Sequence, residues 1–176
     1  YTLLLISFAI SSVFIFLILL YITAPYGKHI REKWGPSINN KIGWFFMEIP
    51  TVILYVLFYF IGDKTFQILP TIFLIIWLTH YIHRALIFPF LLRGKSKMPV
   101  LIMLFGLIFN LINTYLQSRW INTFSDPYSV DWLLSPLFIT GTLIFFFGFI
   151  INIHSDYIIR NLRAPGENEH KIPKGG

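Results

Sequence analysis

The sequence predicts an all-α fold: a polytopic bundle of transmembrane helices that forms a single integral membrane domain over residues 1–176. Hydrophobic residues make up 56% of the chain and charged residues only 12%, against about 25% charged in a typical soluble domain. The apolar residues gather in blocks close to the ~20 residues that a helix needs to cross a bilayer. Most Lys and Arg residues fall between these blocks, as they do in membrane proteins.

Five apolar blocks are long enough to be predicted as membrane spans, at about residues 3–24, 42–61, 66–92, 99–117 and 132–153. No Lys or Arg precedes the first block, so we interpret it as a span and not as a cleaved signal peptide. The third block is longer than a simple span and contains Pro70 and Pro89. These prolines predict tilt or a kink near each of its ends.

The basic residues predict how the spans are oriented. The first loop holds four Lys or Arg, the third holds three and the tail (residues 154–176) holds four, whereas the second and fourth loops hold one each. The positive-inside rule places the loops with more Lys and Arg in the cytoplasm. We therefore expect the N-terminus outside and the tail in the cytoplasm, in a bacterial inner membrane or the endoplasmic reticulum.

Composition also narrows the classes of function. The formal net charge is +6, and the positions of the basic residues explain it as an orientation signal and as contact with anionic head groups. We therefore expect membrane lipids, and no nucleic acid, as partners, and no obligate protein partner is evident. The chain has no Cys, which excludes disulfides, thiolate metal sites and a Cys nucleophile. It stops at "KIPKGG" without a terminal element, and we interpret it as cut off there.

Glu48 is the candidate catalytic carboxylate. An ionisable side chain inside a span costs roughly 2.5–3.5 kcal/mol on insertion scales and usually marks function. Glu48 lies ~9 Å below the cytoplasmic edge of the second span at 1.5 Å per residue, and Tyr81 of the third span is a residue that could face it. The carboxylate can orient the phenol, which can donate to a substrate oxygen that becomes negative during reaction. The alternative is that Glu48 is only a hydrogen-bonding group in helix packing.

The third span also carries "THYIHR", residues 79–84. His80 and Arg84 are one helical turn apart, and we expect the Arg to satisfy backbone carbonyls or to extend to the interface. Metal binding by His80 and His83 is a weaker alternative, because their spacing comes without nearby carboxylates. We expect no metal site.

The fifth span passes abruptly from "TLIFFFGFI" into "INIHSDYIIRNLRAPGE", residues 151–167. At 100° per residue, Asn152, Asp156, Arg160 and Arg163 fall on one stripe of about 80°. One interpretation of this stripe is a solvated helix end. The other is a site at the cytoplasmic mouth for a ligand with phosphates, which Arg binds in a bidentate manner.

Other basic residues, Lys95, Lys171 and Lys174, could add charge to such a phosphate site. The sequence has neither a GxGxxG motif nor a P-loop. Any nucleotide would therefore be bound without a Rossmann or Walker fold.

These residues closely resemble the steroid 5α-reductase family, the 3-oxo-5α-steroid 4-dehydrogenases. The tail "NIHSDYIIRNLRAPGE…KIPKGG" is similar to that family's N-I-H-S-D-Y-x-L-R-x-L-R-x-P-G-E stretch followed by I-P-x-G-G. "APYGKH", "MEIP", "HYIHR" and "LRGK" at residues 24–29, 47–50, 80–84 and 92–95 resemble the family's motifs in its order. The resemblance covers almost the whole chain.

The resemblance implies a seven-helix membrane fold, of which this chain holds five helices. It also implies NADPH-dependent reduction of the Δ4 bond of a 3-oxo steroid or another lipid-like enone, with hydride added at C5. Glu48 and Tyr81 match the pair that polarises the 3-oxo group. From the resemblance and the stripe together, the cofactor-binding candidates are Asn152, Asp156, Arg160, Arg163, Arg93, Lys95 and Lys171. The substrate-binding candidates are Trp44, Met47 and Tyr26.

Two alternatives remain open on sequence alone. One is an enzyme of the same membrane superfamily, either a trans-enoyl-CoA reductase or an isoprenylcysteine methyltransferase-like protein. The methyltransferase would use S-adenosylmethionine and would give the Glu48–Tyr81 pair no role. The other is a non-enzymatic polytopic protein whose polar residues serve only helix packing, and it predicts no nucleotide binding.

Overall fold

A computed structural model of the chain describes residues 1–23, 35–93 and 96–162. Within these ranges, five helical segments are long and apolar enough to cross a membrane, at Thr2–Leu19, Asn40–Phe60, Ile68–Leu91, Val100–Phe124 and Pro136–Asn161. The predicted all-α bundle is confirmed, and the chain is an integral membrane protein. The last two segments run beyond residues 117 and 153, where their spans were predicted to end. Apolar residues mark the hydrocarbon region, whereas backbone hydrogen bonds carry a helix on into the polar interface.

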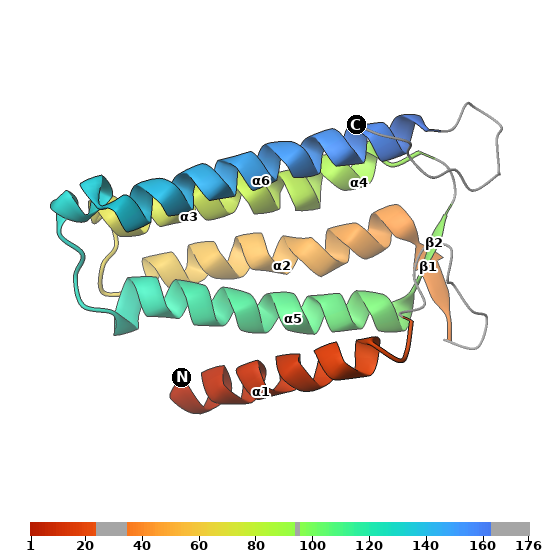
Figure 1. Cartoon of the computed structure of the whole chain (residues 1–176), viewed down its shortest axis with the longest axis horizontal. Coiled ribbons are helices and arrows are strands. Elements are labelled where there is room, and N and C mark those ends of the chain that lie inside the picture. The colour runs from red at the N-terminus through yellow and green to blue at the C-terminus, as the bar shows by residue number, and fades with distance from the viewer. Residues whose placement is uncertain (24–34, 94–95, 163–176) are drawn as a thin grey trace.

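Helix α2 (Asn40–Phe60) lies between helix α3 (Ile68–Ile82) on one side and helix α5 (Val100–Arg119) on the other (Figure 1). Helix α6 (Pro136–Asn161) runs along α3, and helix α1 (Thr2–Leu19) lies beyond α5. Aromatic rings make these outer contacts. Phe149 of α6 lies 5.7 Å from His80 of α3, and Phe8 of α1 lies 5.7 Å from Phe109 of α5.

A small antiparallel sheet, which the sequence analysis did not predict, joins the starts of α2 and α5. Strand β1 (Ser37–Asn39) pairs with strand β2 (Lys97–Pro99), and Ile38 lies opposite Met98. Helix α2 follows β1 directly and α5 follows β2 directly. The two helices therefore start at the same end of the molecule, and Figure 1 shows that they run in the same direction.

Small and polar residues let α5 approach α2 closely. They recur at every fourth position of α5 and the π-helical turn η4 (Trp120–Phe124) that continues it: Gly106, Asn110, Thr114, Ser118 and Asn122. All but Gly106 are buried, and a side chain at Gly106 would overlap the sulfur of Met47 on α2. Small residues at such spacing are typical of tightly packed membrane helices, where polar side chains also hydrogen-bond within and between helices.

The third span is irregular near its C-terminal end, as Pro89 predicted. Helix α3 continues into the π-helical turn η3 (His83–Ile87) and then into α4 (Phe88–Leu91). Pro89 has no N–H to donate to the carbonyl of Ala85, and the preceding residue, Phe88, donates instead to the carbonyl of His83. Pro70 lies in the first turn of α3, where an N–H has no helical partner, so the helix passes it unbroken.

Lys64 closes the opposite end of the bundle, in the loop between α2 and α3. Its amine is buried and donates to the carbonyls of Ser125 and Ile121 and to the Ser125 hydroxyl, the last at 2.8 Å. Ile121 lies in η4, and Ser125 directly follows it, before the 3₁₀ helix η5 (Val130–Leu134). Burial lowers the pKa of the Lys64 amine, while the nearby Asp126 and Asp63 act to raise it.

Candidate active site

Glu48 lies in the interface between α2 and α5, with its side chain buried. The amide nitrogen of Asn110 on α5 donates to Glu48 Oε2 at 3.0 Å and to the backbone carbonyl of Met47 at 2.9 Å. Because a charged or polar group in an apolar environment needs a hydrogen-bond partner, Asn110 explains how α2 tolerates a carboxyl group here. Met47 itself is buried against α5.

Tyr81 lies on α3, with its ring stacked on Trp77 at 4.5 Å between centroids. Trp77 in turn contacts Tyr55 of α2 at 4.8 Å. The amide nitrogen of Asn113 on α5 donates to the phenol oxygen of Tyr81 over 3.5 Å, which is a long hydrogen bond. Two α5 amides less than one turn apart thus contact the predicted catalytic pair, Asn110 at the carboxyl group and Asn113 at the phenol.

No hydrogen bond joins Tyr81 to Glu48 directly, although both side chains are described. The structure therefore places the two groups around the same stretch of α5 without a hydrogen bond between them. Their catalytic roles stay predictions. The amide positions on α5 are visible in the sequence, because Asn110, Asn113 and Gln117 recur in a mainly apolar span at spacings of three and four residues.

Arg84 is the cation of this region, and its partner differs from what the sequence predicted. Its guanidinium forms an ion pair with Asp156 of α6, with Nη1 3.1 Å from Oδ2. The same group lies 4.4 Å from the centre of the Trp44 ring and 4.3 Å from that of Phe88. Arg84 is thus neither a cap for backbone carbonyls nor an interfacial residue, because a carboxylate 72 positions away in the sequence lies beside it.

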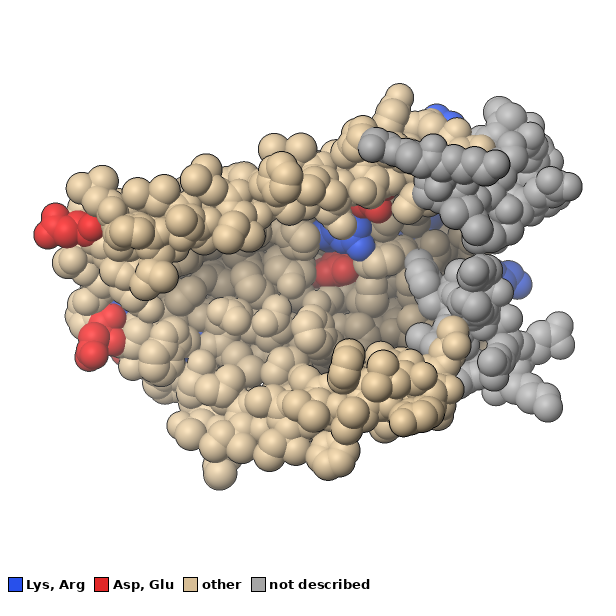
Figure 2. Space-filling model, viewed as in Figure 1, with Lys and Arg blue, Asp and Glu red and all other residues tan. Residues whose placement is uncertain are grey.

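The charged groups lie in a hollow on one face of the molecule. Figure 2 shows positive and negative side chains together in this hollow, away from both ends and surrounded by uncharged atoms. Arg84 and Asp156 are only 13% and 21% exposed. An ion pair with so little access to water is less screened by salt than a surface pair.

The cofactor-binding candidates are only partly described. Asp156 is paired with Arg84, whereas Asn152 is exposed on α6 and Arg160 lies 5.5 Å from the ring of Tyr157. Arg93 is exposed just after α4. Three further cofactor-binding candidates lie outside the described residues, namely Lys95, Arg163 and Lys171, and so does the substrate-binding candidate Tyr26.

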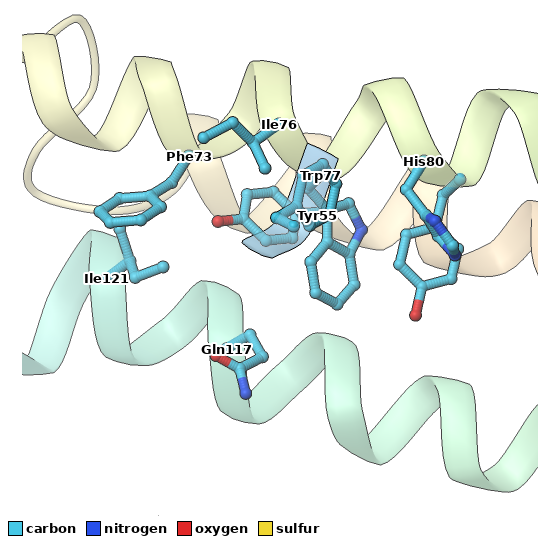
Figure 3. A pocket seen from close by; sticks show the side chains of 9 residues that line it. Tyr55, Phe73, Ile76, Trp77, His80, Gln117 and Ile121 are labelled. Carbon is cyan, nitrogen blue, oxygen red and sulfur yellow. The ribbon is translucent and has the colours of Figure 1, made fainter. Parts of the chain in front are cut away.

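A cavity of about 380 Å³ extends between α2, α3, α5 and α6. Its walls are mainly aromatic and aliphatic, and they come from Tyr55, Phe73, Ile76, Trp77, His80, Tyr81, Gln117, Ile121 and Phe145. Figure 3 shows Trp77 and Tyr55 meeting between the helices, with Gln117 and Ile121 on the α5 side. Tyr81 lines this cavity, whereas Glu48, Trp44 and Met47 do not.

Two histidines border the same region. His80 lines the cavity and contacts Phe145 and Phe149, and the His83 ring lies 5.7 Å from Phe149. His83 Nδ1 and the Trp44 indole N–H are buried and have no hydrogen-bond partner among the described residues. These two polar atoms flank the Arg84–Asp156 pair and could accept or donate a bond to a bound molecule.

Comparison with known proteins agrees with the motifs. Residues 96–176 match the sequence profile of the family described as 3-oxo-5-alpha-steroid 4-dehydrogenase. The chain is 37% identical over 165 residues to 3-oxo-5-alpha-steroid 4-dehydrogenase 1 of Bos taurus, an alignment that covers 92% of this chain and 64% of the relative. It is 36% identical over 164 residues to steroid 5-alpha-reductase DET2 of Gossypium hirsutum, covering 90% of this chain and 63% of the relative.

The human 3-oxo-5-alpha-steroid 4-dehydrogenase 1 is similar to the same degree. It is 37% identical over 154 residues, which is 86% of this chain and 59% of the human protein. The chain thus spans about three fifths of the length of the curated relatives that it matches.

Proposed function

The chain is a relative of the 3-oxo-5-alpha-steroid 4-dehydrogenases, and on this premise we propose that it reduces the Δ4 double bond of a 3-oxo steroid with NADPH. One structural observation supports this reaction at the Glu48–Tyr81 site. Tyr81 lines an apolar cavity, and two neighbouring amides of α5 donate hydrogen bonds to its phenol and to the carboxyl group of Glu48. An apolar cavity with few polar groups suits a ligand that is mostly hydrocarbon.

The dimensions of the cavity support a rigid, elongated substrate. Its lining on α3 runs from Phe73 to Tyr81, a rise of about 12 Å at 1.5 Å per residue. Along this path the Trp77 ring contacts the rings of Tyr55 and Tyr81. A flat four-ring nucleus would lie along these rings, with its ketone toward Tyr81.

The side chains would act on the ketone. NADPH, when bound, supplies the hydride that is added to C5. The electron pair of the C4–C5 double bond then moves toward C3, and negative charge gathers on the 3-oxo oxygen. Tyr81 donates a hydrogen bond to that oxygen and stabilises charge that is greatest in the transition state. Glu48 orients the polar groups around the ketone, and C4 finally takes up a proton.

The polar end of α6 fits a phosphate-bearing cofactor. Arg160 and Arg93 form no ion pair among the described residues, and Trp44 Nε1 and His83 Nδ1 lack partners there. Guanidinium groups bind phosphate in a bidentate manner. Asn152 and Asp156 would add an amide and a carboxylate for hydroxyl or amide groups, and Arg163, Lys95 and Lys171 would add charge.

We also propose that the N-terminus lies outside and the α6 end faces the cytoplasm, because the basic residues cluster on that side. Thiol labelling of a Lys174→Cys variant tests this orientation, since the chain has no other Cys. Labelling from the cytoplasmic side is expected. Labelling only from the outside would contradict both the topology and the cofactor assignment.

The function is tested by following NADPH absorbance in detergent-solubilised protein with testosterone or progesterone. A matched steroid that is saturated between C4 and C5 serves as the control and should cause no loss of NADPH. The product should contain two additional hydrogens, one of them at C5 from the cofactor. Consumption of NADPH only with an enoyl-CoA, or methyl transfer from S-adenosylmethionine, would replace the steroid proposal. Absence of nucleotide binding would favour a non-enzymatic membrane protein.

A further inference from the structure

Helix α5 contributes two amides to the region of Glu48 and Tyr81, and the proposed reaction gives them no role so far. Asn110 and Asn113 lie in the middle of a helix that is otherwise mainly apolar. An amide inside a membrane span is retained at a cost unless its hydrogen bonds are made. The Asn110 amide donates its hydrogen bonds to α2 and the Asn113 amide donates to α3, and neither donates to the neighbouring turn of α5.

Asn110 is bound to α2 by two hydrogen bonds. Its single amide nitrogen reaches Glu48 Oε2 at 3.0 Å and the Met47 carbonyl at 2.9 Å, which uses both of its donors. The side chain is buried, and Gly106, one turn earlier, admits Met47 beside it. Thr51 donates in addition to the Glu48 backbone carbonyl at 2.6 Å. Glu48 therefore has one carboxylate oxygen fixed by α5, and its helix is held at the same point.

Asn113 contacts the second predicted catalytic group, the phenol of Tyr81. Its amide nitrogen donates to the phenol oxygen. A phenol whose oxygen accepts one hydrogen bond keeps its own O–H free to donate elsewhere. The Tyr81 side chain lines the cavity, so the free O–H is available to a ligand there. The bond measures 3.5 Å, and catalytic hydrogen bonds are often long until the substrate is bound.

We propose that Asn110 and Asn113 are positioning residues, which hold the Glu48 carboxyl group and the Tyr81 phenol at a fixed spacing for one substrate carbonyl. The inference rests on the proposed function. Donation from Asn113 polarises the phenol and strengthens its donation to the ketone, because linked hydrogen bonds reinforce one another. Donation from Asn110 keeps the carboxyl group from turning away from the site.

The test is a pair of double-mutant cycles on the full-length protein in detergent, read as the rate of enone reduction with NADPH. One cycle combines Asn113→Leu with Tyr81→Phe, and the other combines Asn110→Leu with Glu48→Leu. Leu approximates Asn in size but has no donor. Ile108→Ala, on an exposed position of the same helix, is the matched control and should change the rate less than about 2-fold.

Asn113→Leu should lower kcat about 2- to 10-fold with little change in KM, because the lost bond acts on the transition state. In the Tyr81→Phe background it should have no further effect. Asn110→Leu should lower kcat about 10-fold or more, because its bond is to an ionisable group, and should add little once Glu48 is Leu. Additive losses in either cycle would overturn the positioning role of that residue and leave packing as its explanation.

A second readout does not depend on turnover. The decrease in Tm caused by Asn110→Leu should be smaller in the Glu48→Leu background than in the wild type, because the shared bond can be lost only once. If the wild type reduces no enone, the proposed function fails, and this cycle alone then decides whether Asn110 holds Glu48. Equal decreases in both backgrounds would overturn the inference whatever the activity.

Discussion

Helices α2 and α6 are both apolar and long enough to cross a membrane, yet they differ in how much of their surface is covered by protein. Of the 21 residues of α2, six are buried: Gly43, Met47, Glu48, Thr51, Tyr55 and Tyr59. Helix α6 has 26 residues and buries none within the described structure. Hydrophobicity therefore does not predict how much of a helix is covered by protein, since lipid tails and core side chains are equally apolar.

The difference lies in where polar and small residues occur. The buried face of α2 contains a carboxyl group, a hydroxyl and two phenols, and it meets the small and polar residues of α5. The middle of α6 contains mainly Phe, Ile and Leu, and its charged and amide residues lie at the end that follows Ile151. In contrast, Glu48 and Asn110 lie inside their spans and mark the buried interface of α2 with α5 at the candidate site.

The largest expected effect comes from the polar pair in the interior. Tyr81→Phe should lower kcat by about 10²–10³-fold with little change in the KM for the steroid, because the lost donor acts mainly in the transition state. Glu48→Gln should also lower kcat, and the double variant should be little worse than the poorer single one. Steady-state kinetics at saturating NADPH measure this. A Phe variant with near-normal turnover would mean that Tyr81 only packs.

The next effect concerns the polar end of α6. Asp156→Ala should weaken NADPH binding by about 10- to 150-fold, which corresponds to the roughly 1.5–3 kcal/mol of a charge-assisted contact. The loss includes the unpaired charge left on Arg84, which is 13% exposed. Cofactor titration measures the change, with Asn161→Ala at the exposed end of the same helix as the control. If Asp156→Ala binds NADPH with normal affinity, Asp156 only forms the ion pair with Arg84 and does not contact the cofactor.

Arg163 belongs to the same predicted stripe as Asp156 but lies outside the described residues, and Arg163→Ala tests its contribution to NADPH binding in the same way. It should also weaken NADPH binding, by a similar factor, through loss of a phosphate contact. If both Asp156→Ala and Arg163→Ala bind cofactor normally while still inserting in the membrane, the stripe is only a solvated helix end.

Two glycines, Gly62 and Gly148, test how closely the helices pack without changing a candidate functional residue. A Cβ on Gly62, just after α2, would lie 2.7 Å from the backbone oxygen of Asn122, so Gly62→Ala should cost about 1–3 kcal/mol of stability through overpacking. On α6, nothing lies within 4 Å of a Cβ at Gly148, and Gly148→Ala should be neutral or stabilising, since Ala favours helix. Thermal unfolding in detergent compares them. Equal decreases in Tm would show that α6 is as closely packed as α2.

The smallest effect is expected at an exposed position of α6. Phe147 is 68% exposed, and Phe147→Leu should change stability by less than ~0.5 kcal/mol because most of the side chain lies outside the protein interior. The same thermal measurement checks it. A clear loss would indicate that a protein surface, and not lipid, covers this part of α6.

The sequence by itself determined the spans, because helix length and apolarity are set by the thickness of the bilayer. It also contains the resemblance to the 3-oxo-5-alpha-steroid 4-dehydrogenases, since the motifs around Glu48, Tyr81 and Asp156 can be compared without a structure. Pro89 predicted an irregular turn because its missing N–H is a local property. The polar positions of α5 were visible too, but nothing in their spacing said which helix they face.

Only the tertiary structure decided the partners. Arg84 and Asp156 are 72 residues apart and Asn110 and Glu48 are 62 apart, so no local period relates them. The pairing of β1 with β2 holds the starts of α2 and α5 together, and the two helices run in the same direction. Asn110 of α5 then meets Glu48 of α2, whereas Asn113 meets Tyr81 of α3. Side-chain chemistry can be read along a chain, but which groups meet depends on the packing of helices that the sequence places far apart.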